Sequence, residues 1–268
     1  MGPIIMGLSV ILGEIIVYKT GLQVQEVVFG FFTMFFLTGS AFVVNDVLDI
    51  EIDRINAPHR PLITGEMSEK AAIYYGILLA ILGLSFSVLL SLHALAFALF
   101  AYFLSLLYNL FAKKTGFIGN VLVSLAISTT IPFGAIIMKE INNQFVWLIA
   151  LLMFLSNTGR EITKGIADAA GDRMKKIRSV ALVYGPHYAA KLAAVFYVLI
   201  SIIGPVFFHM IEVSNLSLLI PTILAEAGFV YSSISLIRNP SREQALNVNT
   251  QINLWMVMLL LVLLLNAF

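Results

Sequence analysis

The chain has 268 residues, of which 60% are hydrophobic and only 12% are charged. A soluble domain carries about 25% charged residues, so this composition excludes an ordinary soluble protein and indicates a polytopic membrane protein. The formal net charge of +1 says little about partners, and we expect no nucleic-acid partner. The absence of cysteine excludes disulfides, thiolate metal sites and cysteine nucleophiles.

Apolar runs long enough to cross a bilayer recur along the whole chain. A helix needs about 20 mostly apolar residues to do so, and this length predicts an all-α fold with nine spans, eight being the alternative. The first run counts as a span because it lacks a basic leading segment and contains Glu14. The expected spans are about 2–18, 27–46, 70–91, 93–112, 118–138, 143–163, 187–208, 215–237 and 250–268.

The basic residues predict how the chain is oriented. With a cytoplasmic N-terminus, all but two of the 16 lysines and arginines fall in or beside cytoplasmic loops, the exceptions being Lys19 and Lys139. The positive-inside rule therefore predicts that the loops after spans two, four, six and eight are cytoplasmic. The two longest of them, 47–69 and 164–186, are expected to carry function.

Each of these long loops begins with an acidic cluster at the end of an apolar run. Side chains four residues apart share a helix face, so each cluster directs hard oxygen ligands one way, an arrangement that suits Mg²⁺. The alternative is a solvated helix end just outside the membrane. The metal-ligand candidates are Asn45, Asp46, Asp49, Asp53, Asp168 and Asp172. The catalytic candidates are Asp49, Asp53, Asp168 and Asp172.

The two clusters also have matching positions. Asp168 follows Asp49 at the same sequence separation as Asp172 follows Asp53. This repeat predicts one transmembrane domain, 1–268, made of two pseudo-repeated halves, about 1–112 and 113–268. Because internal duplication commonly places a binding site between halves, we expect the clusters to face each other across one cavity.

Cationic side chains precede the second cluster. Arg160 and Lys164 continue the four-residue series toward Asp168, so one helix stripe runs from two cations to the acids. Cations contact phosphate oxygens directly and carboxylates reach them through Mg²⁺, which predicts a polyphosphate site. Ordinary pairing within the helix, worth only a few tenths of a kcal/mol, is the alternative.

Two other segments supply candidates for diphosphate binding. Tyr108 precedes Lys113 by five residues, about one and a half α-helical turns, so the phenol would lie deeper in the membrane than the ammonium. Lys114 is as well explained as a membrane-surface anchor. The full set of diphosphate candidates is Lys113, Arg160, Lys164, Tyr108, Asn56 and Arg60.

Together these motifs resemble the UbiA superfamily of intramembrane prenyltransferases. The resemblance covers nearly the whole chain and implies nine helices around a central cavity with a cytoplasmic cap, and Mg²⁺-dependent transfer of a prenyl group from its diphosphate. The residues that carry it are the Asn-Asp-x-x-Asp-x-x-x-Asp run at 45–53, Asn56, Arg60-Pro61, the Tyr108 to Lys113 segment and Asp168-x-x-x-Asp172.

Within the superfamily, Arg160-Glu161-Ile162-x-Lys164 is similar to archaeal digeranylgeranylglyceryl phosphate synthases. This similarity implies geranylgeranyl diphosphate as donor, the lipid-like hydroxyl of geranylgeranylglyceryl phosphate as acceptor, and the cell membrane as location. Two departures are Gly165, where such relatives often have an acid, and Met1-Gly2-Pro3, where they often have an Arg/Asn pair. The latter suggests a short N-terminus and a missing phosphate contact.

Three other functions remain as alternatives. A quinone-precursor aromatic ring is the other acceptor that the motifs allow. An ion-coupled transporter would explain the repeat, but not the gathering of cations with acids on one membrane face. CDP-alcohol phosphotransferases also use membrane aspartates, yet in one contiguous motif that is absent here. The histidines, among them His93, lack metal-ligand spacing and are expected at the membrane interface.

Overall fold

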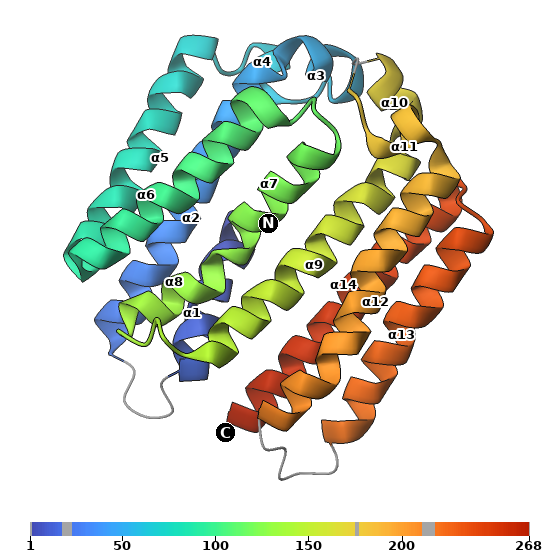
Figure 1. Cartoon of the computed structure of the whole chain (residues 1–268). Coiled ribbons are helices and arrows are strands. Elements are labelled where there is room, and N and C mark those ends of the chain that lie inside the picture. Colours follow the sequence, from blue (N-terminus) through green and yellow to red (C-terminus); the bar gives the residue numbers. More distant parts are fainter. Residues whose placement is uncertain (1, 18–22, 175–176, 211–217, 268) are drawn as a thin grey trace. The chain divides into compact units, whose positions relative to one another are not determined.

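The computed structural model describes residues 2–17, 23–174, 177–210 and 218–267 (Figure 1). Every regular element within these ranges is a helix, which confirms the all-α class. Eight helical segments of the described part are long and apolar enough to cross a membrane. They are Val24–Leu48, Glu69–Leu90, Leu92–Ala112, Phe117–Ile137, Gln144–Ala167, Pro186–Gly204, Leu219–Arg238 and Arg242–Val262.

The first apolar run forms a helix shorter than any of these eight segments. This helix, α1 (Gly2–Val17), has 16 residues, or roughly 24 Å at 1.5 Å per residue, which falls short of a hydrocarbon core of about 30 Å. The expected count of nine spans is therefore not confirmed, although a helix coincides with each predicted run. Glu14 on α1 is fully buried, and neither of its carboxylate oxygens has a hydrogen-bond partner within the described part.

The chain divides into two compact units. The first unit consists of Met1–Ala112 and Thr129–Asn143. Its helices are α1, α2 (Val24–Leu48), α3 (Ile50–Asn56), α4 (Pro61–Thr64), α5 (Glu69–Leu90), α6 (Leu92–Leu107), the π-helix η1 (Tyr108–Ala112) and α8 (Thr130–Ile137).

In the first unit the long helix α2 packs against α1, α5 and α6. Serine caps define where its neighbours begin: the Ser68 hydroxyl accepts a hydrogen bond from the Ala71 N–H (3.2 Å), and Ser91 accepts one from Ala94 (3.0 Å). Each cap satisfies an N–H group that has no partner within the helix. The short helices α3 and α4 follow the C-terminal end of α2 (Figure 1).

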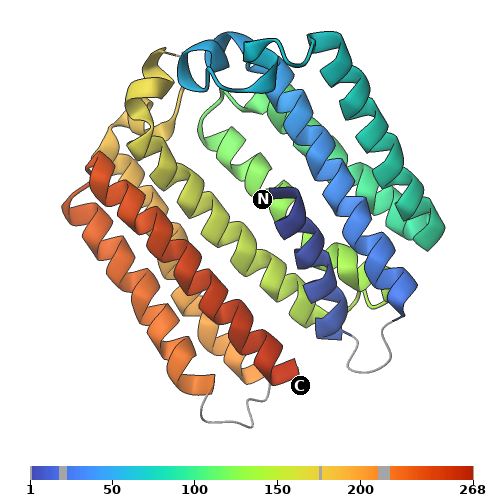
Figure 2. The same cartoon turned by 180° about the vertical axis from the view of Figure 1, so that it is seen from behind.

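Helices α1 and α8 cross at very short range (Figure 2). A Cβ added at Gly13 would collide with the Ile131 carbonyl oxygen. A Cβ added at Gly134 would collide with the Val10 carbonyl oxygen and lie 2.7 Å from the Glu14 nitrogen. Small residues that let two backbones approach are typical of helix packing in membranes.

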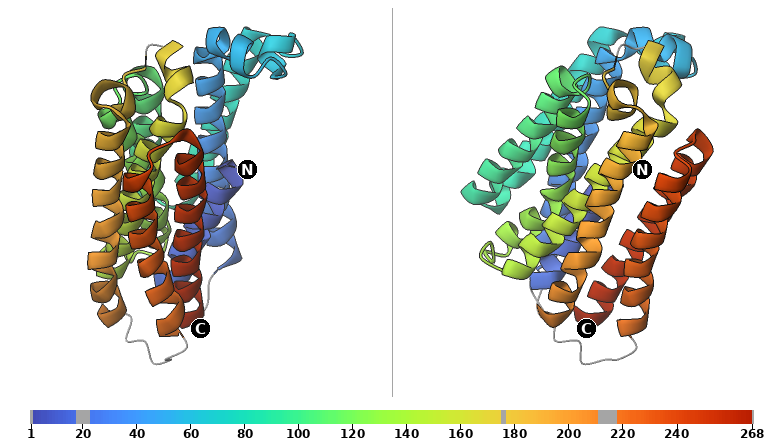
Figure 3. Two further views of the ribbon diagram at one scale, coloured as in Figure 1. Left: turned by 90° about the vertical axis from the view of Figure 1, so that its right-hand side faces the viewer. Right: turned by 45° about the vertical axis from the view of Figure 1, so that its right-hand side comes forward.

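The second unit consists of Lys113–Ser128 and Gln144–Phe268. Helix α9 packs against α7, α12 and α14, and α13 packs against both α12 and α14 (Figure 3). The apolar run 117–137 is thus shared, since α7 belongs to this unit and α8 to the first. The helices of the unit are α7 (Phe117–Ser128), α9 (Gln144–Ala167), α10 (Ala169–Met174), α11 (Val180–Tyr184), α12 (Pro186–Met210), α13 (Leu219–Arg238) and α14 (Arg242–Ala267).

One polar contact fixes α9 against α12. The buried ring of Tyr197 packs on Gly159, where an added Cβ would lie 2.6 Å from its Cε1 atom. The Tyr197 hydroxyl and the Thr163 Oγ1 atom are 2.8 Å apart and share a hydrogen bond. The packing of the Tyr197 ring and the hydrogen bond of its hydroxyl therefore both depend on small residues of α9, Gly159 and Thr163.

Candidate active site

The first acidic cluster lies where α2 gives way to α3. Asp49 joins the two helices with φ −98° and ψ 6°, so the continuous helix expected through residue 53 is interrupted there. The backbone bonds nevertheless continue, from the Asp49 N–H to the Asn45 carbonyl (3.0 Å) and from Asp53 to Asp49 (2.8 Å). The Asn45 amide also donates to the Asp49 carboxylate at 3.3 Å. The four-residue spacing of the cluster therefore survives the break.

Arg60 brings two of these carboxylates together. It is the N-cap of α4, followed by Pro61, and this return of the chain directs the guanidinium toward the end of α2. A single nitrogen, Nη1, donates to Asp46 Oδ1 at 2.7 Å and to Asp53 Oδ2 at 2.5 Å. The Asp53 side chain is only 9% exposed, whereas that of Asp46 is 41% exposed.

These ion pairs of Arg60 were not predicted from the sequence, from which Arg60 was expected only to bind diphosphate. A pocket of about 190 Å³ opens beside them. It is lined by Val43, Asp46, Asp53, Arg60, Pro61, Leu62, Met67, Ala72 and Tyr75. The side chain of Asn56, another diphosphate candidate, is outside what the structure describes.

The segment from Tyr108 departs from the expected geometry. It forms the π-helix η1, in which hydrogen bonds run from residue i to i+5, so five residues make about one turn and the expectation of one and a half turns is wrong. Asn109 in η1 donates its amide to the Ala41 carbonyl of α2 at 3.0 Å. Sequence reasoning missed Asn109, although an amide at the end of an apolar span is a signal for such a contact.

The segment that carries Lys113 belongs to the second unit. The Lys114 carbonyl accepts a hydrogen bond from the Arg178 N–H at 3.2 Å, and Gly116 follows with φ +71°. A Cβ at Gly116 would collide with the Arg178 carbonyl oxygen, so only glycine permits this approach. The residues directly after Lys113 therefore contact Arg178, in the segment that follows the second acidic cluster.

The second acidic cluster repeats the local structure of the first. Asp168 joins α9 to α10, just as Asp49 joins α2 to α3. Its N–H donates to the Lys164 carbonyl at 2.9 Å, and the Asp172 N–H donates to the Asp168 carbonyl at 2.9 Å. Within its own unit, each aspartate pair therefore begins at a helix junction and spans one further turn.

The two cations of α9 share a carboxylate. Arg160 Nη2 lies 3.3 Å from Glu161 Oε1, and Lys164 Nζ lies 4.0 Å from Glu161 Oε2. Arg160 Nη1 also donates to Asn253 Oδ1 on α14 at 3.4 Å. Pairing within the helix is thus realised, with a carboxylate to which the sequence assigned no role. Asn249 and Asn253 lie four residues apart where the last apolar run begins, and this spacing was a signal for the polar face of α14.

The structure leaves part of the predicted site open. Among the residues it describes, no three histidine, aspartate or glutamate side chains form a ready-made metal site. The aspartates at 49 and 53 belong to the first unit and those at 168 and 172 to the second, so their facing each other remains a prediction. Lys175 and Lys176, cations after the second cluster, lie outside the described residues.

A sequence model of the UbiA prenyltransferase family matches residues 6–265. The chain belongs to this family. It is accordingly a prenyltransferase enzyme and a multi-pass membrane protein. The family resemblance drawn from the motifs is confirmed.

Individual relatives of this UbiA family member agree with the match. A digeranylgeranylglyceryl phosphate synthase from Archaeoglobus fulgidus is 34% identical over 240 residues, covering 88% of this chain and 82% of the relative. A solved structure from work on digeranylgeranylglyceryl phosphate synthase in membranes has a TM-score of 0.86 at 29% identity, covering 99% of this chain and 94% of the other. A UbiA homologue from Archaeoglobus fulgidus bound to DMAPP and Mg²⁺ shares the fold, with a TM-score of 0.70 at 17% identity and 96% coverage of each chain.

Proposed function

We propose that this UbiA family enzyme transfers a geranylgeranyl group from its diphosphate to geranylgeranylglyceryl phosphate, with Mg²⁺ as cofactor. The observation that carries the proposal is the repeated aspartate pair at two helix junctions, each with cationic side chains nearby. Paired carboxylates and cations together are what a metal-bound diphosphate requires. The relative from Archaeoglobus fulgidus, a synthase of the corresponding lipid product, supports this choice of substrates.

The donor set around Arg60 fits a divalent cation. Oδ1 of Asp46 and Oδ2 of Asp53 lie 2.7 and 2.5 Å from the same nitrogen, so two hard oxygen ligands already converge on one position that holds positive charge. Asn45, Asp46, Asp49 and Asp53 would hold one Mg²⁺, and Asp168 with Asp172 a second. When bound, Mg²⁺ supplies charge that neutralises the diphosphate as the leaving group.

The remaining residues act on the diphosphate directly. Lys113, Arg160 and Lys164 would bind its oxygens and stabilise the negative charge that grows as the carbon–oxygen bond breaks. The acceptor hydroxyl oxygen then attacks the allylic cation left on the prenyl chain and gives up its proton, so that the ether bond forms as diphosphate and H⁺ are released. Glu161, which contacts both cations of α9, orients them in the absence of substrate. Tyr108, Asn56 and Arg60 complete the proposed binding set.

We also propose that both clusters face the cytoplasm. The distribution of lysine and arginine supports this orientation through the positive-inside rule. The anionic heads of the prenyl diphosphate and of the phosphate-bearing acceptor would then meet the site on the side where cations are concentrated. An acceptor phosphate needs an anion site beyond the one for diphosphate, and Arg54, Arg173 and Arg178 are candidates for it.

The acceptor is tested by direct assay. Purified protein is incubated with radiolabelled geranylgeranyl diphosphate, Mg²⁺ and either geranylgeranylglyceryl phosphate or 4-hydroxybenzoate. We expect label in the glycerol lipid, and none after addition of EDTA until Mg²⁺ is restored. Label in 4-hydroxybenzoate with none in the glycerol phosphate would refute the lipid assignment and favour the aromatic alternative.

The metal site is tested by substitution in each cluster. Asp49→Ala and Asp168→Ala should each abolish transfer while the protein stays folded, because each removes a ligand from a shared metal–diphosphate site. The matched control is Glu51→Ala, since Glu51 is 82% exposed and pairs only at 3.7 Å with the exposed Arg54. Near-normal turnover in either aspartate variant, with the control also active, would contradict the two-cluster site.

A further inference from the structure

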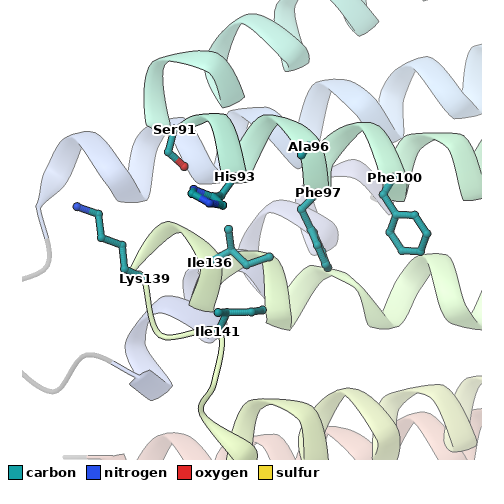
Figure 4. A pocket seen from close by; sticks show the side chains of 8 residues that line it. All are labelled: Ser91, His93, Ala96, Phe97, Phe100, Ile136, Lys139 and Ile141. Carbon is teal, nitrogen blue, oxygen red and sulfur yellow. The ribbon is translucent and has the colours of Figure 1, made fainter.

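The first unit contains a larger pocket at the opposite end of α6 from η1 (Figure 4). Its volume is about 610 Å³, within the usual range of roughly 300–1,000 Å³ for small-molecule sites. It is lined by Ser91, His93, Ala96, Phe97, Phe100, Ile136, Lys139 and Ile141. Helix α6 has 16 residues, so its two ends are roughly 24 Å apart and this Lys139 pocket is remote from the acidic cluster of the same unit.

The lining of the Lys139 pocket changes from polar to apolar along its length. Figure 4 shows His93 and Lys139 toward one end and Phe97 and then Phe100 toward the other, along α6. This order follows from the four-residue and three-residue spacings of one helix face. A pocket with a cationic side chain at one end and aromatic rings at the other is complementary to an amphiphile that carries an anionic head on a hydrocarbon chain.

Lys139 has an unusual backbone conformation. At the end of helix α8 the Lys139 N–H donates to the Ile136 carbonyl at 3.0 Å, and the Glu140 N–H donates to the Ala135 carbonyl at 2.8 Å. This pair of hydrogen bonds is a Schellman cap. The capping position adopts φ 61°, for which glycine is the usual residue, and in the described part Lys139 is the one non-glycine residue with positive φ. Strain of this kind is often found at binding sites.

The charge of Lys139 is available to a ligand. Its side chain is exposed, and within the described residues no hydrogen bond or ion pair holds its ammonium group. It is also one of only two lysines or arginines that lie outside the expected cytoplasmic loops and their flanks. The positive-inside rule therefore does not explain why a lysine, with its unfavourable backbone conformation, stands at position 139.

We propose that the Lys139 pocket binds one phospholipid of the surrounding bilayer. Its phosphate would contact the Lys139 ammonium with His93 nearby, and one hydrocarbon chain would lie against Phe97 and Phe100. The lipid enters from the membrane face at the end of the first unit away from the acidic cluster, so it is neither donor nor acceptor of the transfer reaction. The pocket therefore serves as a structural lipid site.

The test measures lipid binding by native mass spectrometry in a neutral detergent. Delipidated protein is titrated with a phosphatidylglycerol and, separately, with the diacylglycerol that has the same chains. We expect the wild type to bind the phosphatidylglycerol at least tenfold more tightly. Lys139→Gln should remove most of this preference, because one charge-assisted contact is worth about tenfold. The control is Lys70→Gln, an exposed lysine on α5 that should change nothing.

Two further variants separate charge from packing. Lys139→Gly removes the cation but suits the backbone conformation, so it should lose the preference without lowering the unfolding temperature in lipid-free detergent. Ala96→Phe fills the pocket and should weaken binding of both lipids. Binding of phosphatidylglycerol that is unchanged in all three variants, or occupation by geranylgeranyl diphosphate instead, would overturn the proposal. Because binding is the readout, failure of the proposed transfer reaction would leave this test valid.

Discussion

Replacing Arg60 should have opposite effects on metal binding and on turnover. In the structure its Nη1 atom stands between the Asp46 and Asp53 carboxylates, where a divalent cation would bind. A metal ion that enters without diphosphate must first displace this guanidinium. Arg60→Gln removes the competing charge, so Mg²⁺ alone should bind more tightly to the variant. Turnover should fall, since Arg60 is also proposed to contact the diphosphate.

The size of the effect follows from the two ion pairs. The contact with Asp53, whose side chain is 9% exposed, belongs to the range of about 1.5–3 kcal/mol for hydrogen bonds to charged groups. In the contact with Asp46, the carboxylate side chain is 41% exposed and the arginine side chain 38%. Water therefore screens this ion pair, which contributes well under about 1 kcal/mol. A total of about 2 kcal/mol corresponds to roughly 30-fold tighter Mg²⁺ binding.

Isothermal titration calorimetry with Mg²⁺, in the absence of any diphosphate, measures this difference. The matched control is Arg54→Gln, because Arg54 is 64% exposed and its partner Glu51 is 82% exposed, so its loss should leave Mg²⁺ affinity unchanged. Equal or weaker binding of Mg²⁺ by Arg60→Gln, with the control unaffected, would show that the arginine does not occupy the metal position.

Three further outcomes are expected. Lys113→Ala should weaken binding of geranylgeranyl diphosphate more than Lys114→Ala does, as measured by direct titration, and equal losses would mean that the assignment of the two lysines is wrong. Gly134→Ala should destabilise the protein by roughly 1–3 kcal/mol in a thermal unfolding assay, because its Cβ meets backbone, whereas Gly39→Ala, whose Cβ would lie 3.4 Å from a flexible Leu79 atom, should be tolerated. Transfer to geranylgeranylglyceryl phosphate should fall as salt or inorganic phosphate is added, and a salt-independent rate would argue against a second anion site.

The helices and the family were accessible from the sequence because their signals are local. The apolar run at 70–91 becomes α5 (Glu69–Leu90) almost residue for residue, since a bilayer fixes the length of a span. Asp49 and Asp168 follow the ends of such runs, and this position already indicated that each begins the segment that leads into a loop. The motifs that carried the UbiA resemblance are short and contiguous, so they could be recognised without any knowledge of the fold.

The contacts that the sequence did not reveal depend on distant parts of the chain or on small shifts in helix geometry. Arg60 reaches Asp46 because α3 and α4 turn the chain back, and no pattern of spacing encodes that return. The π-helical turn at Tyr108 coincides with the bond from Asn109 to α2, which lies 68 residues away. The first apolar run was placed correctly as α1 (Gly2–Val17), but its apolar character alone does not establish that a helix of 16 residues crosses the bilayer.

Tyr197 of α12 fixes the rotation of α9, the helix that carries the proposed diphosphate ligands Arg160 and Lys164. Its ring fills the notch left by Gly159 and its hydroxyl is held by Thr163, so α9 cannot turn about its axis without breaking one contact or the other. Arg160 directly follows Gly159, and Lys164 directly follows Thr163. The directions of both cationic side chains therefore depend on how the buried Tyr197 holds α9. Tyr197→Phe would remove the hydrogen bond to Thr163, so we expect it to alter the orientation of Arg160 and Lys164. Variants selected for a different acceptor should therefore keep Tyr197.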